Sequence, residues 1–110
     1  GHEVHKNHLT EAQWNEWTNI SDTSKYFISD YAETSPEEDF AESIPQYWIT
    51  EFKIRDHCSD YTDMECLEKF ERQSFWYVDE NGIIRTLTKE KIAFFMKNIK
   101  SVYGGWEYQE

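Results

Sequence analysis

The sequence is short of basic residues and has no long hydrophobic runs. It contains 11 Lys and Arg residues against 22 Asp and Glu, so its formal net charge is -11 with His taken as neutral. A chain with this charge repels the phosphate backbone of nucleic acids and anionic lipid surfaces, which excludes nucleic-acid binding. No apolar stretch approaches the roughly 20 residues that a membrane helix requires, and we therefore expect no membrane span.

Hydrophobic residues are also scarce, at 38% of the chain, but aromatic residues make up 17%. The 5 Trp, 7 Tyr and 7 Phe residues can fill a hydrophobic core although Val and Leu are few, so we expect a folded chain. Its 110 residues suffice for one small domain and exclude a two-domain enzyme. The chain begins with Gly-His and has neither Met nor an apolar signal core there, which indicates a processed product, a fragment or a few added residues.

The negative charge is concentrated near the start. Residues 1–42 contain ten acids and two lysines, a net charge of -8. The densest part is residues 30–42, D-Y-A-E-T-S-P-E-E-D-F-A-E, which has six carboxylates and no base. Such a cluster is either a solvated face or a cation site.

Helix signals are clear in the first half of the chain. Thr10 is a suitable N-cap for a short first helix. Ser35 followed by Pro36 is a stronger start, since Pro is favoured at the first helical position. An apolar stripe then predicts one long helix over residues 36–54, bent where Pro45 removes an internal hydrogen bond.

The second half predicts a helix, a hairpin and a helix. The first of these helices starts near residues 60–62. Residues 74–78 and 83–87 flank Asn81-Gly82, which is a hairpin signal. Thr88 is positioned to cap the last helix.

These elements predict a mostly α (α+β) fold with one small β-hairpin. We expect residues 1–110 to form a single domain or fragment. Within it, residues 1–54 would hold the candidate site helices and the acidic segment, and residues 55–110 would hold the helix, hairpin and helix.

Cys58 and Cys66 are the only cysteines and lie between the long helix and the next one. A pair at this spacing favours one disulfide across a short loop, which would place the protein in an oxidising environment, secreted or extracellular. Two alternatives stay open. One is a metal site that includes His57 and would need a fourth ligand, and the other is a pair of free buried thiols.

Three histidines lie within the first eight residues, G-H-E-V-H-K-N-H. Such a cluster at a chain start can be a solvent-exposed arm or a leftover affinity sequence. In zincin metalloproteases the helix motif H-E-x-x-H gives zinc two His ligands at i and i+4, with the Glu as general base. Gly1-His2 can be the last two positions of such a motif, H-E-x-G-H.

The acidic segment carries the more specific pattern. Tyr31 is followed seven residues later by Glu38, and residues 38–42 read E-D-F-A-E. This arrangement closely resembles the second half of the site in the zinc metalloprotease family of anthrax lethal factor and the Pro-Pro endopeptidases. In that family a Tyr and a Glu at this separation follow the H-E-x-x-H helix by a few tens of residues. The resemblance spans roughly residues 1–48, and its specificity comes from the combination of these pieces.

The resemblance implies a zincin-like catalytic domain, of which this chain would be the C-terminal helical subdomain. The implied activity is hydrolysis of a peptide bond in a protein or peptide substrate by a zinc-activated water. His2 and Glu38 would bind zinc, and Tyr31 would be the catalytic phenol that donates a hydrogen bond to the developing oxyanion. Glu42, one turn after Glu38, could orient a His ligand, and Glu37 could contact substrate or solvent.

The chain departs from the family pattern because the first His and the catalytic Glu would precede Gly1. His2 and Glu38 do not complete a catalytic zinc site, which needs three protein ligands and a water. We therefore expect a preceding segment of the same protease domain to supply the rest, and whether this chain is an enzyme depends on that segment. His5 could substitute in principle, but H-E-V-H is one residue too short for the motif.

Each of these residues also has an ordinary structural interpretation. Glu38 stands three residues after Ser35, which is the spacing of a capping box. Tyr31 taken alone would be a half-buried packing residue, and Glu42 would be a solvated one. The alternative function is a non-catalytic zincin-like domain that acts as an acidic protein-interaction module.

Overall fold

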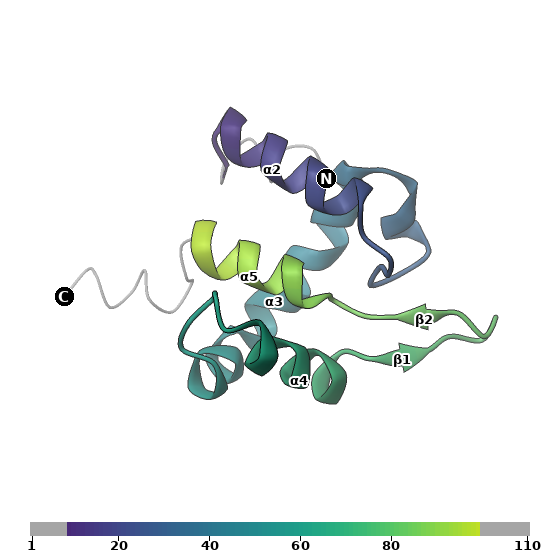
Figure 1. Ribbon diagram of the computed structural model, residues 1–110. Coiled ribbons are helices and arrows are strands. Elements are labelled where there is room, and N and C mark those ends of the chain that lie inside the picture. The colour runs from purple at the N-terminus through teal and green to yellow at the C-terminus, as the bar shows by residue number, and fades with distance from the viewer. Residues whose placement is uncertain (1–8, 100–110) are drawn as a thin grey trace.

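The computed structural model describes residues 9–99 (Figure 1). This part of the chain contains four α-helices, one short 3-10 helix and a two-stranded antiparallel hairpin. The elements are, in order, α2 (Glu11–Asp22), η1 (Tyr31–Thr34), α3 (Pro36–His57), α4 (Met64–Ser74), β1 (Tyr77–Val78), β2 (Ile84–Arg85) and α5 (Lys89–Asn98). The predicted class, mostly α with one small hairpin, is confirmed.

The helices gather around α5. In Figure 1, α5 lies between α2 and α4, α3 runs behind it, and the hairpin extends from one end of the helical part. Within residues 9–99, no helix has both the length and the apolar character that crossing a membrane requires.

Helix α2 starts at a capping box. Thr10 Oγ1 accepts a hydrogen bond from the Gln13 N–H at 3.2 Å, and the Gln13 side chain accepts one from the Thr10 N–H at 2.9 Å. These bonds satisfy two amides that a helix start leaves without partners. Further along, the fully buried Trp17 donates its indole N–H to the Pro36 carbonyl at 2.9 Å, which fixes α2 against the start of α3.

Helix α3 begins where the local sequence predicts. Ser35 Oγ accepts from the Glu38 N–H at 3.2 Å, and Pro36 occupies the first turn. The helix continues through Pro45 and ends at His57, so the predicted end at residue 54 is three residues short.

Helix α4 begins later than predicted because two aspartates hold the preceding residues in a turn. Asp60 Oδ1 accepts from the Thr62 N–H at 2.8 Å. Asp63 is the N-cap of α4 and accepts from the Cys66 N–H at 3.2 Å. Carboxylates that bond to nearby amides compete with helix formation, and α4 therefore starts only after Asp63.

The hairpin is shorter than its sequence signal. The paired residues are Tyr77 with Arg85 and Val78 with Ile84. Each strand has two residues, against the predicted 74–78 and 83–87. Gly82 turns the chain with a φ of 78°, a left-handed conformation that Gly adopts without steric cost.

An aromatic cluster fills the core between α2, α3 and α5. The ring of Phe95 is fully buried and lies 5.1 Å from Trp17, 5.8 Å from Phe40 and 5.2 Å from Tyr47. Large rings in such contacts stabilise a core beyond the area that they bury. Since the four rings come from three helices, this cluster holds α3 against both α2 and α5.

Cys58 and Cys66 form a disulfide, with their Cα atoms 5.8 Å apart. Cys58 is the C-cap of α3 and Cys66 lies in the first turn of α4, so the bond joins the two helices. The predicted disulfide is confirmed. The alternatives of a thiolate metal site and of free thiols are wrong, because both sulfurs are used in the bond.

Replacing both cysteines (Cys58→Ala with Cys66→Ala) should lower the free energy of unfolding by about 2–3 kcal/mol. This is the chain-entropy effect expected for a loop of about nine residues, given the sequence separation of 8. Urea unfolding at neutral pH measures the loss. Addition of a reductant should lower the stability of the natural chain to that of the variant, and an unchanged stability under reductant would contradict the prediction.

Candidate functional site

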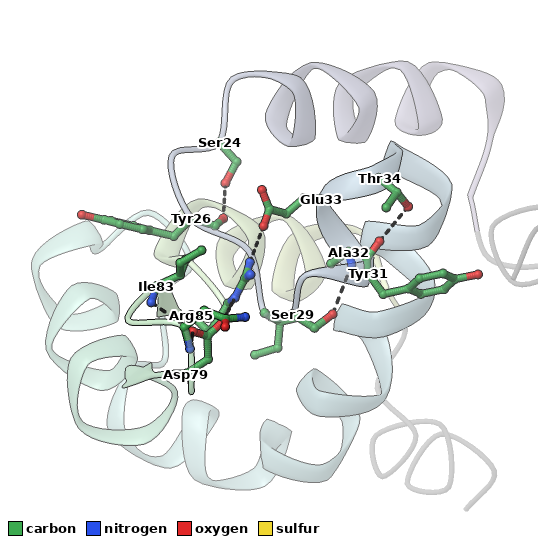
Figure 2. Close-up of polar contacts among 12 residues, drawn as sticks. Ser24, Tyr26, Ser29, Tyr31, Ala32, Glu33, Thr34, Asp79, Ile83 and Arg85 are labelled. Atoms are coloured by element: carbon green, nitrogen blue, oxygen red, sulfur yellow. Dashed lines mark hydrogen bonds and ion pairs between the residues drawn. The ribbon is translucent and has the colours of Figure 1, made fainter.

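Tyr31 and Glu38 meet at the junction of η1 and α3. Tyr31 Oη donates a hydrogen bond to Glu38 Oε2 at 2.9 Å. The chain turns between them in two steps. Thr34 Oγ1 donates to the Tyr31 carbonyl at 2.7 Å (Figure 2), and Ser35 then caps α3. The separation of seven residues is thus one 3-10 turn followed by the first turn of an α-helix. This path of the backbone places the Tyr31 hydroxyl next to the Glu38 carboxylate.

Glu42 lies one helical turn after Glu38 and is held by the same segment. Ser29 Oγ donates to Glu42 Oε1 at 3.0 Å and accepts from the Ala32 N–H at 3.1 Å. Glu38 and Glu42 are both half-buried. Two carboxylates therefore share one face of α3, and each accepts a hydrogen bond from a hydroxyl of residues 29–31.

The neighbouring carboxylate changes the acidity of Tyr31. The pKa of Tyr31 is raised above the usual phenol value, first by the hydrogen bond that it donates to Glu38 and next by the negative charge of Glu38. An ionised phenol could not donate this bond and would be repelled by the carboxylate. Tyr31 therefore remains a protonated donor at neutral pH, with its side chain 55% exposed.

Asp39 points away from this pair, into the protein. Asp39 Oδ2 lies 2.8 Å from Lys91 Nζ, and both side chains are 0% exposed. Ser21 Oγ donates to Asp39 Oδ2 at 2.8 Å, and Ser43 Oγ donates to Oδ1 at 3.0 Å. Lys91 also donates to the Tyr26 carbonyl at 3.2 Å. The E-D-F-A-E run thus places two carboxylates on the outer face and a third one inside, where it fixes α3 to α5 and α2.

A second ion-pair cluster anchors η1 from the side of the hairpin (Figure 2). Arg85 of β2 is 3% exposed, and its guanidinium pairs with the carboxylates of Glu33 and Asp79. Close by, the Thr86 N–H donates to the Phe27 carbonyl at 3.0 Å. The 3-10 helix η1 is therefore attached to the hairpin through Glu33 and to α3 through Tyr31.

A hollow of about 280 Å³ lies beside Glu42. Its walls are Ile28, Ser29, Glu42, Gln46 and Tyr77. Tyr77 Oη donates to the Ile28 carbonyl at 3.1 Å, which holds the hairpin against this side of the site. The outer face of α3 is therefore recessed next to Glu42.

Four of the predicted zinc-site residues lie in the part of the chain that the structure describes. It brings Tyr31 and Glu38 into contact, with Glu42 on the same face. Glu37 lies in the first turn of α3, where an acid interacts favourably with the helix dipole. His2 lies outside the described residues, so its predicted role as a ligand stays a prediction.

The hydrogen bonds of Glu38 bear on the capping alternative. The Glu38 backbone N–H donates to Ser35, as a cap requires, whereas its carboxylate accepts from Tyr31.

Within residues 9–99, no group of three or more His, Cys, Asp and Glu side chains is placed to hold a metal ion. A zinc ion at Glu38 would therefore need ligands from outside that range.

Comparisons with known proteins do not assign this site. No family model, no curated protein and no solved structure matches the chain. The resemblance to the lethal factor and Pro-Pro endopeptidase family thus depends on the residue pattern, and the function is argued from the geometry of the site.

Proposed function

We propose that this chain is the C-terminal part of the catalytic domain of a zinc metallopeptidase that acts on a protein or peptide substrate. The observation that carries the proposal is the 2.9 Å hydrogen bond between Tyr31 Oη and Glu38 Oε2. Glu42 lies one turn further along α3, on the same face. These are the residue types that the zincin resemblance requires, and they lie close enough together to act in one site.

Each side chain has a role that its position allows. Glu38 would bind zinc, and Tyr31 beside it would turn its single O–H from Glu38 to the oxyanion that develops on the substrate carbonyl. Glu42 would accept a hydrogen bond from the ring N–H of a His ligand and so fix the orientation of the imidazole. Glu37 would contact substrate or solvent. Zinc, when bound, would activate a water molecule and polarise the scissile carbonyl.

Glu38 alone cannot form a catalytic zinc site, because such a site uses three protein ligands. The other ligands have to come from outside residues 9–99. Residues 9–99 supply Glu38 but no group of three candidate ligands. We propose that His2 is the second ligand. The first His and the general-base Glu would come from a segment preceding Gly1, which makes that segment a partner of this chain within one catalytic domain.

The Cys58–Cys66 bond supports an extracellular setting for this activity. Disulfides persist in oxidising compartments and are rare where thiols are kept reduced. We infer that the protein is secreted.

Calorimetric zinc titration tests the metal assignment on the protein that includes the preceding segment. Removal of a residue that orients a ligand weakens metal binding roughly 10–100-fold, and we expect this for Glu42→Gln. Glu38→Gln should weaken zinc binding by more than that, since a direct ligand loses its charge. Tyr31→Phe should keep the zinc affinity, because the phenol is not a ligand, but should slow peptide hydrolysis.

Asp30→Asn is the matched control, since it removes one exposed acid from the same segment and should leave zinc binding unchanged. The proposal fails if the protein binds zinc no better than micromolar and Glu38→Gln changes nothing. The alternative would then be a non-catalytic, zincin-like acidic interaction module, an assignment favoured by the net charge of -8 that the ten acids and two lysines of residues 1–42 give.

A further inference from the structure

A pocket of about 370 Å³ lies where the end of α2, the end of α4 and the start of α5 come together. Its walls come from residues 20–26, from α4 with the following Trp76, and from residues 88–90. A volume of this size is typical of sites that hold small molecules. None of the candidate zinc-site residues lines this pocket, so it is a separate feature of the molecule.

Two aromatic rings line the pocket, and a cation lies over each of them. The ring centroids of Tyr26 and Trp76 are 5.1 Å apart, in an edge-to-face arrangement. Figure 2 shows the Tyr26 ring extending away from Arg85. The guanidinium carbon of Arg72 is 4.0 Å from the Trp76 centroid, and Lys25 Nζ is 5.5 Å from the Tyr26 centroid. The rings thus hold both cations at the pocket by their negative faces.

Neither of these cations has an ion-pair partner within residues 9–99, although the chain has 22 acids against 11 bases. Ion pairs in that part of the chain are made by Arg55, Arg85, Lys89, Lys91 and Lys97. In so acidic a chain a basic side chain easily finds a carboxylate. Lys25 and Arg72 therefore leave two positive charges at one pocket available to a ligand.

The acids of the pocket are already engaged. Lys89 Nζ lies 3.5 Å from Glu68 Oε1 and 3.6 Å from Glu90 Oε2. Glu71 is 4% exposed, and its Oε1 accepts the Lys89 backbone N–H at 3.0 Å. The groups that remain for a ligand are cationic, but three nearby carboxylates would repel a highly charged anion. A ligand with a single negative charge fits this balance best.

The hydroxyl of Thr88 gives an independent indication of a ligand. Thr88 lines the pocket, is 6% exposed and is the N-cap of α5, but its side chain makes no capping bond. Its Oγ1 is buried and has no hydrogen-bond partner in the part of the chain that the structure describes. Buried hydroxyls are nearly always paired, and a helix start favours an anion. Both properties point to a ligand oxygen at this end of the pocket.

We propose that this pocket binds a small organic monocarboxylate that carries an aromatic ring. The carboxylate lies between Arg72 and Lys25. A guanidinium over an indole keeps its N–H groups in its own plane, where they can donate to both carboxylate oxygens. The ligand ring packs against Tyr26 and Trp76, and Thr88 supplies a further donor. The site needs no zinc and does not depend on the proposed peptidase function.

Calorimetric titration of the 110-residue chain with 3-phenylpropanoate tests the proposal, with a chelator present so that no metal contributes. We expect binding to one site with a Kd of about 1 mM or lower, which a ligand this small can reach. The neutral 3-phenylpropanamide should bind at least about tenfold more weakly, because it loses charge-assisted hydrogen bonds. Acetate, which lacks the ring, should also bind more weakly.

Three results of this titration would overturn the proposal. The first is the absence of saturable binding. The second is equal binding of the amide or of acetate, because the pocket would then not recognise the charge or the ring. The third is inorganic phosphate that displaces 3-phenylpropanoate and binds more tightly, because the ligand would then be a phosphate.

Arg72→Gln should weaken the binding of 3-phenylpropanoate at least about tenfold, with Lys69→Gln as the matched control. Lys69 is an exposed cation of the same helix that does not line the pocket. Its substitution removes the same charge and should leave the affinity unchanged. Equal losses for the two variants would overturn the proposal, since the attraction would then come from the general charge of the surface.

Thr88→Val keeps the shape of the side chain and removes the hydroxyl. It should weaken the binding of 3-phenylpropanoate about threefold to tenfold, as expected for one neutral hydrogen bond. The Tm of the chain without ligand should not fall, because the hydroxyl has no partner there to lose. An unchanged affinity would overturn the placement of the ligand at the start of α5.

Discussion

Replacing Asp39 by Ala should lower the free energy of unfolding by about 3–5 kcal/mol, the usual cost of breaking a buried ion pair from one side. Lys91 is 0% exposed and would lose the carboxylate 2.8 Å from its Nζ. The hydroxyls of Ser21 and Ser43 would lose their acceptor as well. Urea unfolding at neutral pH measures this loss.

The neighbouring Glu38→Gln is the control for that experiment. Glu38 is half-buried and bonds to the exposed Tyr31, so its substitution should change the stability by no more than about 1 kcal/mol. Equal losses for the two variants would show that the Asp39 contact contributes nothing specific.

The cost of Asp39→Ala should also depend on pH. Burial lowers the pKa of Lys91, and Asp39 opposes that effect, so removal of Asp39 should lower this pKa further. Between that lowered pKa and the ordinary Lys value of about 10.4, the unfolded chain binds more protons than the folded one. The stability of the variant should therefore rise with pH in this range. In the natural chain the same rise begins only at its own, less lowered Lys91 pKa, so the difference in stability between the two should narrow below that pKa and stay constant above it. A difference that widens with pH would contradict this account.

Phe95→Ala should cost about 3–5 kcal/mol, the usual range for deleting a buried Phe ring. The ring is 0% exposed and contacts Trp17, Phe40 and Tyr47, so its removal leaves a cavity that three helices would have to close. Urea unfolding measures the loss, and near-ultraviolet circular dichroism should report the altered surroundings of the remaining rings.

Phe52→Ala supplies a comparison with the same chemical change. Phe52 is 73% exposed, so the substitution in this chain alone should stay within about 0.5 kcal/mol. Similar losses for Phe95→Ala and Phe52→Ala would mean that the aromatic cluster is not the core of this chain.

The elements that were predicted well are those whose signals are local. Ser35 and Pro36 start α3 because the cap and the first turn involve only neighbouring residues. The pairing of Cys58 and Cys66 follows from their spacing across a short loop. The start of α4 was placed too early because the side chains of Asp60 and Asp63 take nearby amides that a helix would use.

In the candidate site, too, a contact between residues close in the chain could be predicted and one between distant residues could not. The separation of Tyr31 and Glu38 was read from the sequence, and their contact arises within one continuous turn. The ion pair of Asp39 and Lys91 was missed, because its partners are 52 residues apart and nothing local marks them. The sequence shows Asp39 only as one of the six carboxylates of residues 30–42, whereas the structure pairs it with Lys91 and so fixes the start of α3 to the core.

The sequence by itself determined the class of fold, the starts of α2, α3 and α5, the disulfide and the acidic segment with its tyrosine. Each depends on contacts between residues close in the chain, or on composition. Only the tertiary structure decided which carboxylates of that segment face outward, because the direction of each depends on what α2, α5 and the hairpin place against α3. It set Asp39 against Lys91 inside and left Glu38, Glu42, Ile49 and Phe52 on the outer face.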